Sequence, residues 1–396
     1  MQRPALLTRP FVLVALTNLS VCIGGFLLIH FPGFLKDLGA GEAEIGRIMA
    51  LSPLMGLLLG PFIGRTMDRR GRRVVILAGS VLETLTIGLY FTLDSIGPWL
   101  YVVRLLHGSA GAMLYMAMFT YAADVVPAAR RTEGLALFGA SGLLPMAISS
   151  VMGDYILAGW DYRALFAATL GFYVVGLVMA LRLRDMHAQH SDQDPPRGIV
   201  AAARQSDLMP VWLVAGSFFV CMGVIFTFLK TFVMSAGLGS VGGFFAAYSL
   251  VAVTLRLFLG WLPDRIGAKR VLAPAVASYA AGLLLLATAT QDVHVLLAGA
   301  CCGIGHGYIF PILFAMVVTR ARDADRGAAM AIYTTLDQGG HLLSGPIFGL
   351  LIQSDGYATA FTAAGCVLGA GALTFFVWDR LRIARDARRH AAPLPG

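Results

Sequence analysis

Charged side chains are scarce in this sequence: Asp, Glu, Lys and Arg make up 13% of its 396 residues, whereas 58% are hydrophobic. The mean hydropathy is +0.75, a balance that excludes a water-soluble protein of this length. The apolar residues form long continuous runs and not the short alternating segments of a β-barrel, which excludes that architecture as well. The solvent for most of the chain must therefore be lipid.

Cysteine is also sparse. The five cysteines are odd in number, lie inside apolar runs and lack the spacing of a disulfide framework or a metal site. We therefore expect neither a metal nor a cofactor. The N-terminus leads straight into the first apolar run without a small-residue cleavage site, so this run is predicted to remain as a helix. The cysteines are Cys22, Cys221, Cys301, Cys302 and Cys366.

Long apolar runs are what the sequence has in abundance. A membrane-spanning helix needs roughly 20 apolar residues, and twelve runs are that long. The predicted fold class is an all-α membrane protein with twelve transmembrane helices. The runs lie near residues 11–35, 43–66, 74–93, 99–123, 133–157, 162–183, 209–234, 241–263, 271–290, 293–318, 328–352 and 358–379.

The formal net charge of +8 is unevenly distributed along the chain. If successive loops lie on alternate sides of the membrane, 24 of the 30 lysines and arginines fall on the side that holds both termini. This positive-inside asymmetry predicts cytoplasmic termini in a bacterial inner membrane and argues against nucleic acid as a partner. The other six lie on the opposite side or inside helices: Lys36, Arg47, Arg104, Arg163, Lys230 and Arg256.

The chain divides into two similar halves. Its most polar stretch, residues 182–207, separates six helices from six. We predict a six-helix bundle at 1–184, a cytoplasmic linker at 185–208, a second bundle at 209–383 and a basic cytoplasmic tail at 384–396. Three pairs of landmarks indicate a duplication: Asp68 and Asp264 are 196 residues apart, whereas Arg131 and Arg326, and Tyr162 and Tyr357, are 195 apart.

A ten-residue pattern follows the second helix and returns after the eighth. It runs from Gly64 to Arg73 and again from Gly260 to Lys269. Together with a fourth-helix pattern, these motifs resemble those of major facilitator superfamily transporters over essentially the whole chain. The matching residues are Gly64, Asp68, Arg69, Gly71, Arg72 and Arg73; Gly260, Leu262, Asp264, Arg265, Gly267 and Lys269; and Leu100, Arg104, His107 and Gly108, where His107 replaces the family's glutamine.

The resemblance implies a monomeric transporter whose two six-helix bundles rock about a small-molecule site near the bilayer midplane. Gly71 and Gly267 allow sharp turns, and Asp68 and Asp264 can cap a helix N-terminus or pair with an arginine. The resemblance favours a charge latch that holds one access state and breaks in the other. A solvated turn that only sets topology is the alternative, especially in the second copy, where Ala268 replaces an arginine.

Ionisable side chains inside the predicted helices mark the candidate transport site. A charge at the bilayer centre costs roughly 2.5–3.5 kcal/mol on insertion scales and persists only with a partner or a water-lined cavity. Counting about 1.5 Å per residue from the helix ends places one polar layer near the midplane of each half. The first layer contains Glu83, Arg104 and His107, and the second contains Arg256, His306, Asp337 and His341.

Each of these residues has a functional and a structural interpretation. Asp337 is the leading candidate for binding a coupling proton and Glu83 the second, with interhelical hydrogen bonds as the alternative. Arg104 can bind a substrate carboxylate or relay a proton, or it can form a buried ion pair that fixes helix packing. The imidazoles of His107 and His306 fit apolar faces as packing groups. Two residues near the outer helix ends can guard the outer mouth: His30 and Lys230.

Glycine and proline in helices five and eleven bear on the direction of transport. Gly139, Gly142 and Pro145 resemble a weakened form of the family's antiporter signature, and the stretch from Gly345 to Gly349 is closer to it. The hypothesis is proton-coupled export of a small polar metabolite, such as a siderophore- or opine-like metallophore, a sugar or a drug. Import of a small carboxylate or siderophore-type compound is the alternative. An enzyme is not indicated, because no nucleophile motif or paired-carboxylate constellation is present.

Overall fold

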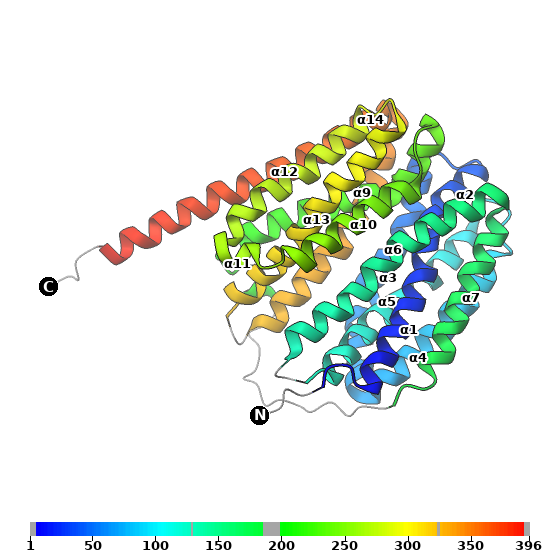
Figure 1. Cartoon of the computed structure of the whole chain (residues 1–396), viewed down its shortest axis with the longest axis horizontal. Helices are drawn as coiled ribbons and strands as arrows, with labels where there is room; N and C mark the ends of the chain where they lie inside the picture. Colours follow the sequence, from blue (N-terminus) through cyan, green and yellow to red (C-terminus); the bar gives the residue numbers. More distant parts are fainter. Residues whose placement is uncertain (1–4, 128–129, 185–198, 323–324, 392–396) are drawn as a thin grey trace.

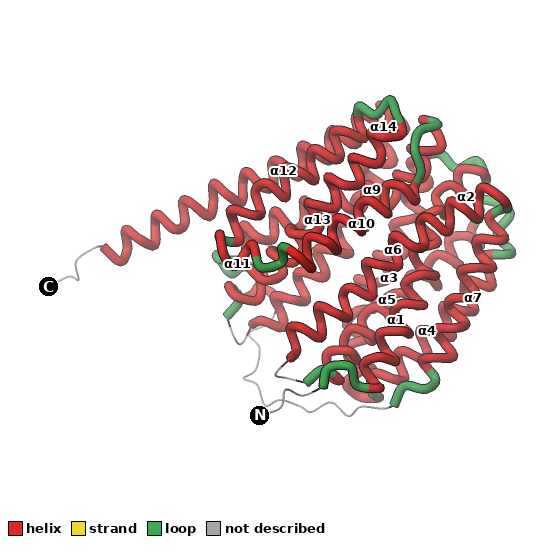
Figure 2. The backbone as a smooth tube through the Cα atoms, in the orientation of Figure 1, coloured by secondary structure: helices red, strands yellow, loops and turns green. Residues whose placement is uncertain are grey.

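The computed structural model describes residues 5–127, 130–184, 199–322 and 325–391. The regular elements of this part of the chain are all helices (Figure 2). They form two bundles that stand side by side (Figure 1). The first is built from residues before the predicted linker, and the second from residues after it.

The first bundle contains six crossings. In the first crossing, α1 (Arg9–Leu27), the 3₁₀ turn η1 (Leu28–His30) and α2 (Phe31–Asp37) follow one another. The α-helix is interrupted there because Pro32 has no N–H to donate to the preceding turn. The other five are α3 (Glu42–Arg70), α4 (Arg72–Tyr90), α5 (Pro98–Val125), α6 (Arg131–Gly159) and α7 (Tyr162–Ala180).

The second bundle repeats this arrangement with α9 (Met209–Ala236), α10 (Val241–Phe258), α12 (Ala268–Ala287), α13 (Asp292–Arg320) and α14 (Arg326–Ala391). Gly356 divides α14, because its φ of 82° and ψ of 172° are not helical. The apolar part of α14, Arg326–Leu381, has 56 residues, which is enough for two crossings of a bilayer. With this division, the twelve predicted helices are confirmed.

Several predicted boundaries are corrected. The signature predicted as a loop is mostly helical: residues 64–70 end α3 and Arg72 and Arg73 begin α4, so only Gly71, with φ 86°, lies between helices. The eighth helix, predicted to reach residue 263, ends at Phe258, and the separate short helix α11 (Leu262–Ile266) follows, with Pro263 in its first turn. Gly267, with φ 102°, then turns the chain into α12.

The predicted linker and tail are only partly covered by the structure. Residues 199–208 include the short helix α8 (Ile199–Ala203), whereas residues 185–198 lie outside the described residues. The predicted tail continues α14 as helix to Ala391, beyond the rest of its bundle (Figure 1). Residues 392–396 lie outside the described part.

The two ends of the bundles are named here by their turns. The signature face carries Gly71 and Gly267, and the opposite face carries the turns at Gly39 and Gly237 and the kink at Gly356. Equivalent helices pack in both bundles: α3 on α5 matches α10 on α13, and α4 on α7 matches α12 on α14. The bundles meet along two seams, one between α3 and α14 and the other between α6 and α10.

Candidate transport site

Three predicted residues meet inside the first bundle. The Nδ1 atom of His107 on α5 lies 3.3 Å from Oε1 of Glu83 on α4, whose side chain is 1% exposed. At this distance the contact is attractive only if a proton lies between the two atoms, carried by either the carboxyl or the ring. Arg104, one turn before His107, lies close enough for its charge to act on both groups.

Arg104 itself is enclosed by packed side chains. Its Nη1 donates a hydrogen bond to the Tyr90 hydroxyl at 2.9 Å, and its guanidinium carbon lies 5.0 Å from the centre of the Phe31 ring. The residue is 3% exposed. These contacts fix the guanidinium by packing, but they are not the buried ion pair predicted as the structural alternative. A substrate carboxylate would reach the guanidinium only after these side chains separate.

The second bundle divides its predicted polar layer into two groups. In the first, Arg256 on α10 donates from Nη2 to the His306 carbonyl at 3.3 Å and from Nε to the Gly307 carbonyl at 3.4 Å. The His306 ring binds elsewhere, with Nδ1 2.7 Å from the Tyr248 hydroxyl. The guanidinium therefore holds the backbone of α13, and the imidazole is fixed by a tyrosine.

The second group, Asp337 and His341, lies one helical turn apart on α14, with 3.9 Å between Oδ1 and Nε2. Gln338 donates to the other carboxylate oxygen at 3.3 Å. The His341 ring meets the Phe226 ring of α9 edge to face at 5.9 Å, and Phe226 lies 6.5 Å from Phe26 of the first bundle. This acid–imidazole pair therefore lies at the junction between the bundles, whereas Glu83 and His107 lie inside one of them.

The predicted latch residues of the first copy form contacts within the first bundle. Asp68 is 68% exposed at its side chain and lies 3.6 Å from Arg72. Arg72 also binds Asp124 at the end of α5, with 3.0 Å between Nε and Oδ2. Arg73 donates to the Leu183 carbonyl at 2.7 Å. Arg69 is exposed at the end of α3, one turn beyond the position of Gly64.

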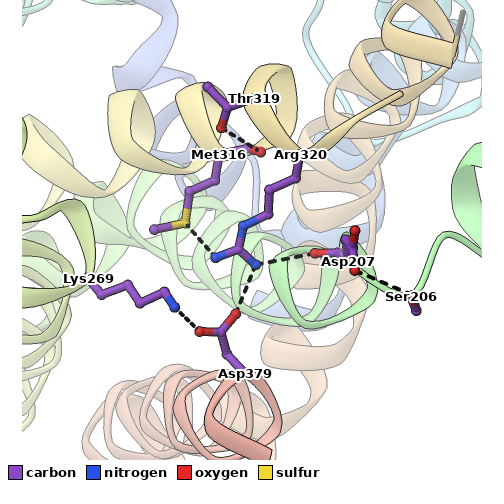
Figure 3. A network of polar contacts seen from close by, with 7 residues as sticks. All are labelled: Ser206, Asp207, Lys269, Met316, Thr319, Arg320 and Asp379. Carbon is purple, nitrogen blue, oxygen red and sulfur yellow. Dashed lines mark hydrogen bonds and ion pairs between the residues drawn. The ribbon is translucent and has the colours of Figure 1, made fainter. Parts of the chain in front are cut away.

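The second copy joins a larger network, drawn in Figure 3. Lys269 and Arg320 both bind the Asp379 carboxylate near the end of the twelfth crossing, the arginine at 3.1 Å. Arg320 also donates to the Asp207 carbonyl at 3.2 Å, just before α9. The remaining residues of this copy flank the network: Gly260 precedes α11, Asp264 and Arg265 lie within it, and Gly267 follows it.

Asp154 on α6 is a polar group that no sequence motif predicts. Its Oδ2 accepts a hydrogen bond from the Gly242 N–H of the other bundle at 2.6 Å, and its Oδ1 lies 3.7 Å from Nδ1 of His30. Lys230 lies near enough for its charge to act on Asp154. His30 and Lys230, the two residues predicted at the outer mouth, therefore both lie near Asp154. Asp154 could have been identified from the sequence as an acid inside the predicted run 133–157, by the same signal that identified Glu83 and Asp337.

No metal centre is apparent in the described part of the chain, where no group of three or more His, Cys, Asp or Glu side chains is placed to hold an ion. The five cysteines are free. The described polar residues can therefore exchange protons through acid–imidazole pairs and form ion pairs at the ends of helices.

Two six-helix bundles with a duplicated signature match a known protein family. The family model described as Major Facilitator Superfamily matches residues 13–261 and, in a second match, residues 238–394. The chain belongs to the major facilitator superfamily. Like other members of that superfamily, it is a multi-pass secondary transporter of small molecules and not an enzyme.

Similar proteins agree with this assignment along most of their length. Multidrug resistance protein 2 of Bacillus subtilis (strain 168) is 23% identical, over 93% of this chain and 95% of the relative. The uncharacterized MFS-type transporter YhhS of Escherichia coli (strain K12) is 26% identical, over 89% of this chain and 88% of the relative. The crystal structure of the nucleoside transporter NupG (D323A mutant) superposes with a TM-score of 0.76 at 14% identity, covering 93% of this chain and 99% of that one.

Proposed function

We propose that the protein is a proton-coupled exporter of a small polar metabolite across the bacterial inner membrane. The observation that carries the coupling is a carboxyl–imidazole pair in each half, Glu83 with His107 and Asp337 with His341. An acid at bilayer depth is costly to maintain and is typical of proton relays in transporters. Each pair can take up or release one proton as its surroundings change between access states.

Asp337 is proposed as the principal coupling group because of its position. It lies at the junction between the bundles, next to Gln338, where a methyl group on Gly56 of α3 would come within 2.9 Å of the Gln338 amide oxygen. A change in the spacing of α3 and α14 therefore changes the surroundings of Asp337 directly. A proton and a substrate that compete for this junction would give antiport.

The orientation proposed places the signature face in the cytoplasm. The concentration of lysine and arginine in the loops of that face supports this placement. The backbones of the two bundles touch near the opposite face, where Gly46 meets Gly345 and Gly242 meets Val151. These contacts support a conformation that is closed at the opposite face and therefore open toward the cytoplasm. The name of the Bacillus relative, a multidrug resistance protein, supports export.

Import of a small carboxylate is the second candidate. The observation in its favour is the Arg256 guanidinium, which is only partly buried and reaches backbone carbonyls and no carboxylate among the described residues. A substrate carboxylate could supply the missing anion. This candidate predicts that proton and substrate move in the same direction.

The test uses purified protein in liposomes that contain the pH dye pyranine. A panel of polar metabolites, drugs and carboxylates is added outside one compound at a time, and uptake is measured by mass spectrometry. A compound that enters by antiport drives protons out and raises the internal pH. Symport lowers the internal pH. The sign of the change is independent of the orientation of the protein in the liposome.

The expected result is a rise in internal pH for at least one transported compound, and loss of the rise in the Asp337→Asn protein. Measured uptake with no pH change in the parent protein would refute proton coupling. A fall in internal pH would replace the export proposal with import by symport.

A further inference from the structure

Both seams near the opposite face are made by backbones in direct contact. In the α3–α14 seam, Gly46 lies against Gly345. In the α6–α10 seam, a methyl group on Gly242 would lie 2.8 Å from the Val151 Cα atom and 3.1 Å from the Ser150 carbonyl oxygen. Gly46 and Gly242 are 196 residues apart, and Ser150 and Gly345 are 195 apart. The two seams are therefore counterparts in the duplication.

Each seam also contains a helix cap that crosses between the bundles. The amides of a first helical turn have no partner within their own helix. In α3, the N–H of Ala43 donates to the side-chain oxygen of Gln353 on α14 at 3.2 Å. In α10, the N–H of Gly242 donates to the carboxylate of Asp154 on α6 at 2.6 Å. Both amides belong to the second residue of their helix.

Neither of these two amides is capped by a side chain of its own helix. Gly41, at the N-cap of α3, has no side chain, so the Gln353 amide supplies the missing acceptor. Ser240, at the N-cap of α10, accepts from the N–H of Gly243 at 2.8 Å. Asp154 takes the neighbouring amide, which Ser240 leaves free. The second bundle thus caps a helix of the first, and the first bundle caps a helix of the second.

The two caps differ in charge. Asp154 brings a carboxylate to the positive end of α10, and such charge-assisted bonds are about twice as strong as neutral ones. His30 of the η1 turn and Lys230 of α9 lie near this carboxylate. Gln353 is a neutral amide, and the described contact it makes with α3 is the single bond to Ala43. The α6–α10 cap is therefore the stronger of the two.

We propose that Asp154 and Gln353 are positioning residues that hold the transporter closed at the opposite face by capping helices across the bundles. Opening at that face breaks both bonds at once and returns two first-turn amides to water. The balance between access states depends on these caps in the order Asp154, then Gln353. This inference needs neither proton coupling nor a particular substrate.

The test measures the distance between the bundles by double electron–electron resonance. Spin labels are attached at Ser95→Cys and Gln291→Cys, two exposed positions in opposite-face turns of different bundles, after the five native cysteines are replaced by serine. The protein is studied in lipid nanodiscs without substrate at constant pH. The variants are Asp154→Ala, Asp154→Asn and Gln353→Ala.

Asp161→Ala is the matched control. Asp161 caps the Ala164 N–H of its own helix, α7, at 3.0 Å on the same face, but it does so inside one bundle. Asp161→Ala removes a helix cap but no contact at a seam, so it should leave the distance between the labels unchanged. The control therefore separates loss of a cap from loss of a contact between the bundles.

We expect Asp154→Ala to raise the population with widely separated labels about tenfold and Gln353→Ala to raise it about threefold, the range seen when caps are removed. Asp154→Asn keeps an acceptor oxygen and should lie between the parent and Asp154→Ala, which also covers the case in which the alanine variant does not fold. An unchanged distribution in both Asp154 variants would overturn the proposal. An equal shift in Asp161→Ala would do the same.

Discussion

The two bundles share one helix order and one pattern of packing, yet they arrange their charges differently. The first gathers an acid, an imidazole and an arginine in one buried cluster, whereas the second separates Arg256 and His306 from Asp337 and His341. Of these two polar layers, the second has its acid–imidazole pair next to the other bundle, whereas the pair of the first is enclosed within its own bundle. Duplication preserved the backbone contacts, while the side chains diverged into one closed site and one site at the junction.

The signature face shows the same divergence at matched positions. Residues 73 and 269, 124 and 320, and 183 and 379 are each 196 apart. Arg73 binds the Leu183 carbonyl, and at the matching place Lys269 binds the Asp379 side chain. Asp124 is replaced by Arg320, so the acid has moved from the fourth crossing to the twelfth. The same helix contact is kept with different chemistry.

The largest expected difference between the bundles concerns coupling. Asp337→Asn should abolish proton-driven accumulation and leave exchange between equal substrate pools intact, because the amide cannot carry the proton. Glu83→Gln should weaken accumulation without abolishing it. Uptake by proteoliposomes with and without a pH gradient measures both. Uphill transport by Asp337→Asn with unchanged pH dependence would show that the coupling group is elsewhere.

The next difference concerns stability. Arg104→Ala leaves the buried Tyr90 hydroxyl without its donor and empties the space that the side chain fills beside Phe31, so it should cost about 2–5 kcal/mol. Arg256→Ala releases backbone carbonyls only and should cost about 1.5–3 kcal/mol. Thermal unfolding in detergent, monitored by tryptophan fluorescence, shows which of the two variants loses more stability. Equal losses would mean that the buried cluster is no more strongly held than the backbone contacts.

A smaller difference is expected at the signature face. Asp379, 3% exposed at its side chain, holds two cations, whereas Asp124, 31% exposed, holds one. Asp379→Asn should lower the stability by about 1–3 kcal/mol and Asp124→Asn by about 1 kcal/mol or less. The same unfolding assay compares them, and added salt should reduce the effect at Asp124 more. The reverse order would contradict the burial argument.

The smallest difference is expected at the turns. Gly71 and Gly267 both have positive φ, at 86° and 102°, a region that is costly for residues with a side chain. Alanine at either position should cost about 1–3 kcal/mol. The two losses should agree closely, because the backbone is the part that the duplication preserved. A clear difference in melting temperature would indicate that one turn can relax.

Much of this architecture could be predicted from the sequence, because lipid restricts what can span it. Long apolar runs predict the helices, and the fixed offset predicts the two bundles. The acid–imidazole contacts could also be predicted from helix geometry. Asp337 and His341 share a helix face at a spacing of four residues, and Glu83 and His107 were predicted at one depth in the membrane. Helix period and rise alone determine these relations.

The contacts between the bundles could not be predicted in this way. Asp154 binds a backbone amide 88 residues away, and a backbone amide has no sequence signal. The breaks at Leu28–His30 and after Phe258 were missed because the apolar runs continue through them. The Asp379 network was missed because its three charged members come from separate helices whose ends meet only in the folded bundle.

The last crossing does more than complete the bundle. From Tyr357 to Ala391 the helix continues for 35 residues, or about 53 Å, against about 30 Å of hydrocarbon. Its clamp at Asp379 lies about 18 Å before its end, so a tilt of about 10° at the clamp moves the end by about 3 Å. Because the helix projects beyond its contact at Asp379, a rotation of the second bundle would move its end farther than residues inside the bundle, and a single probe near Ala391 would report that rotation.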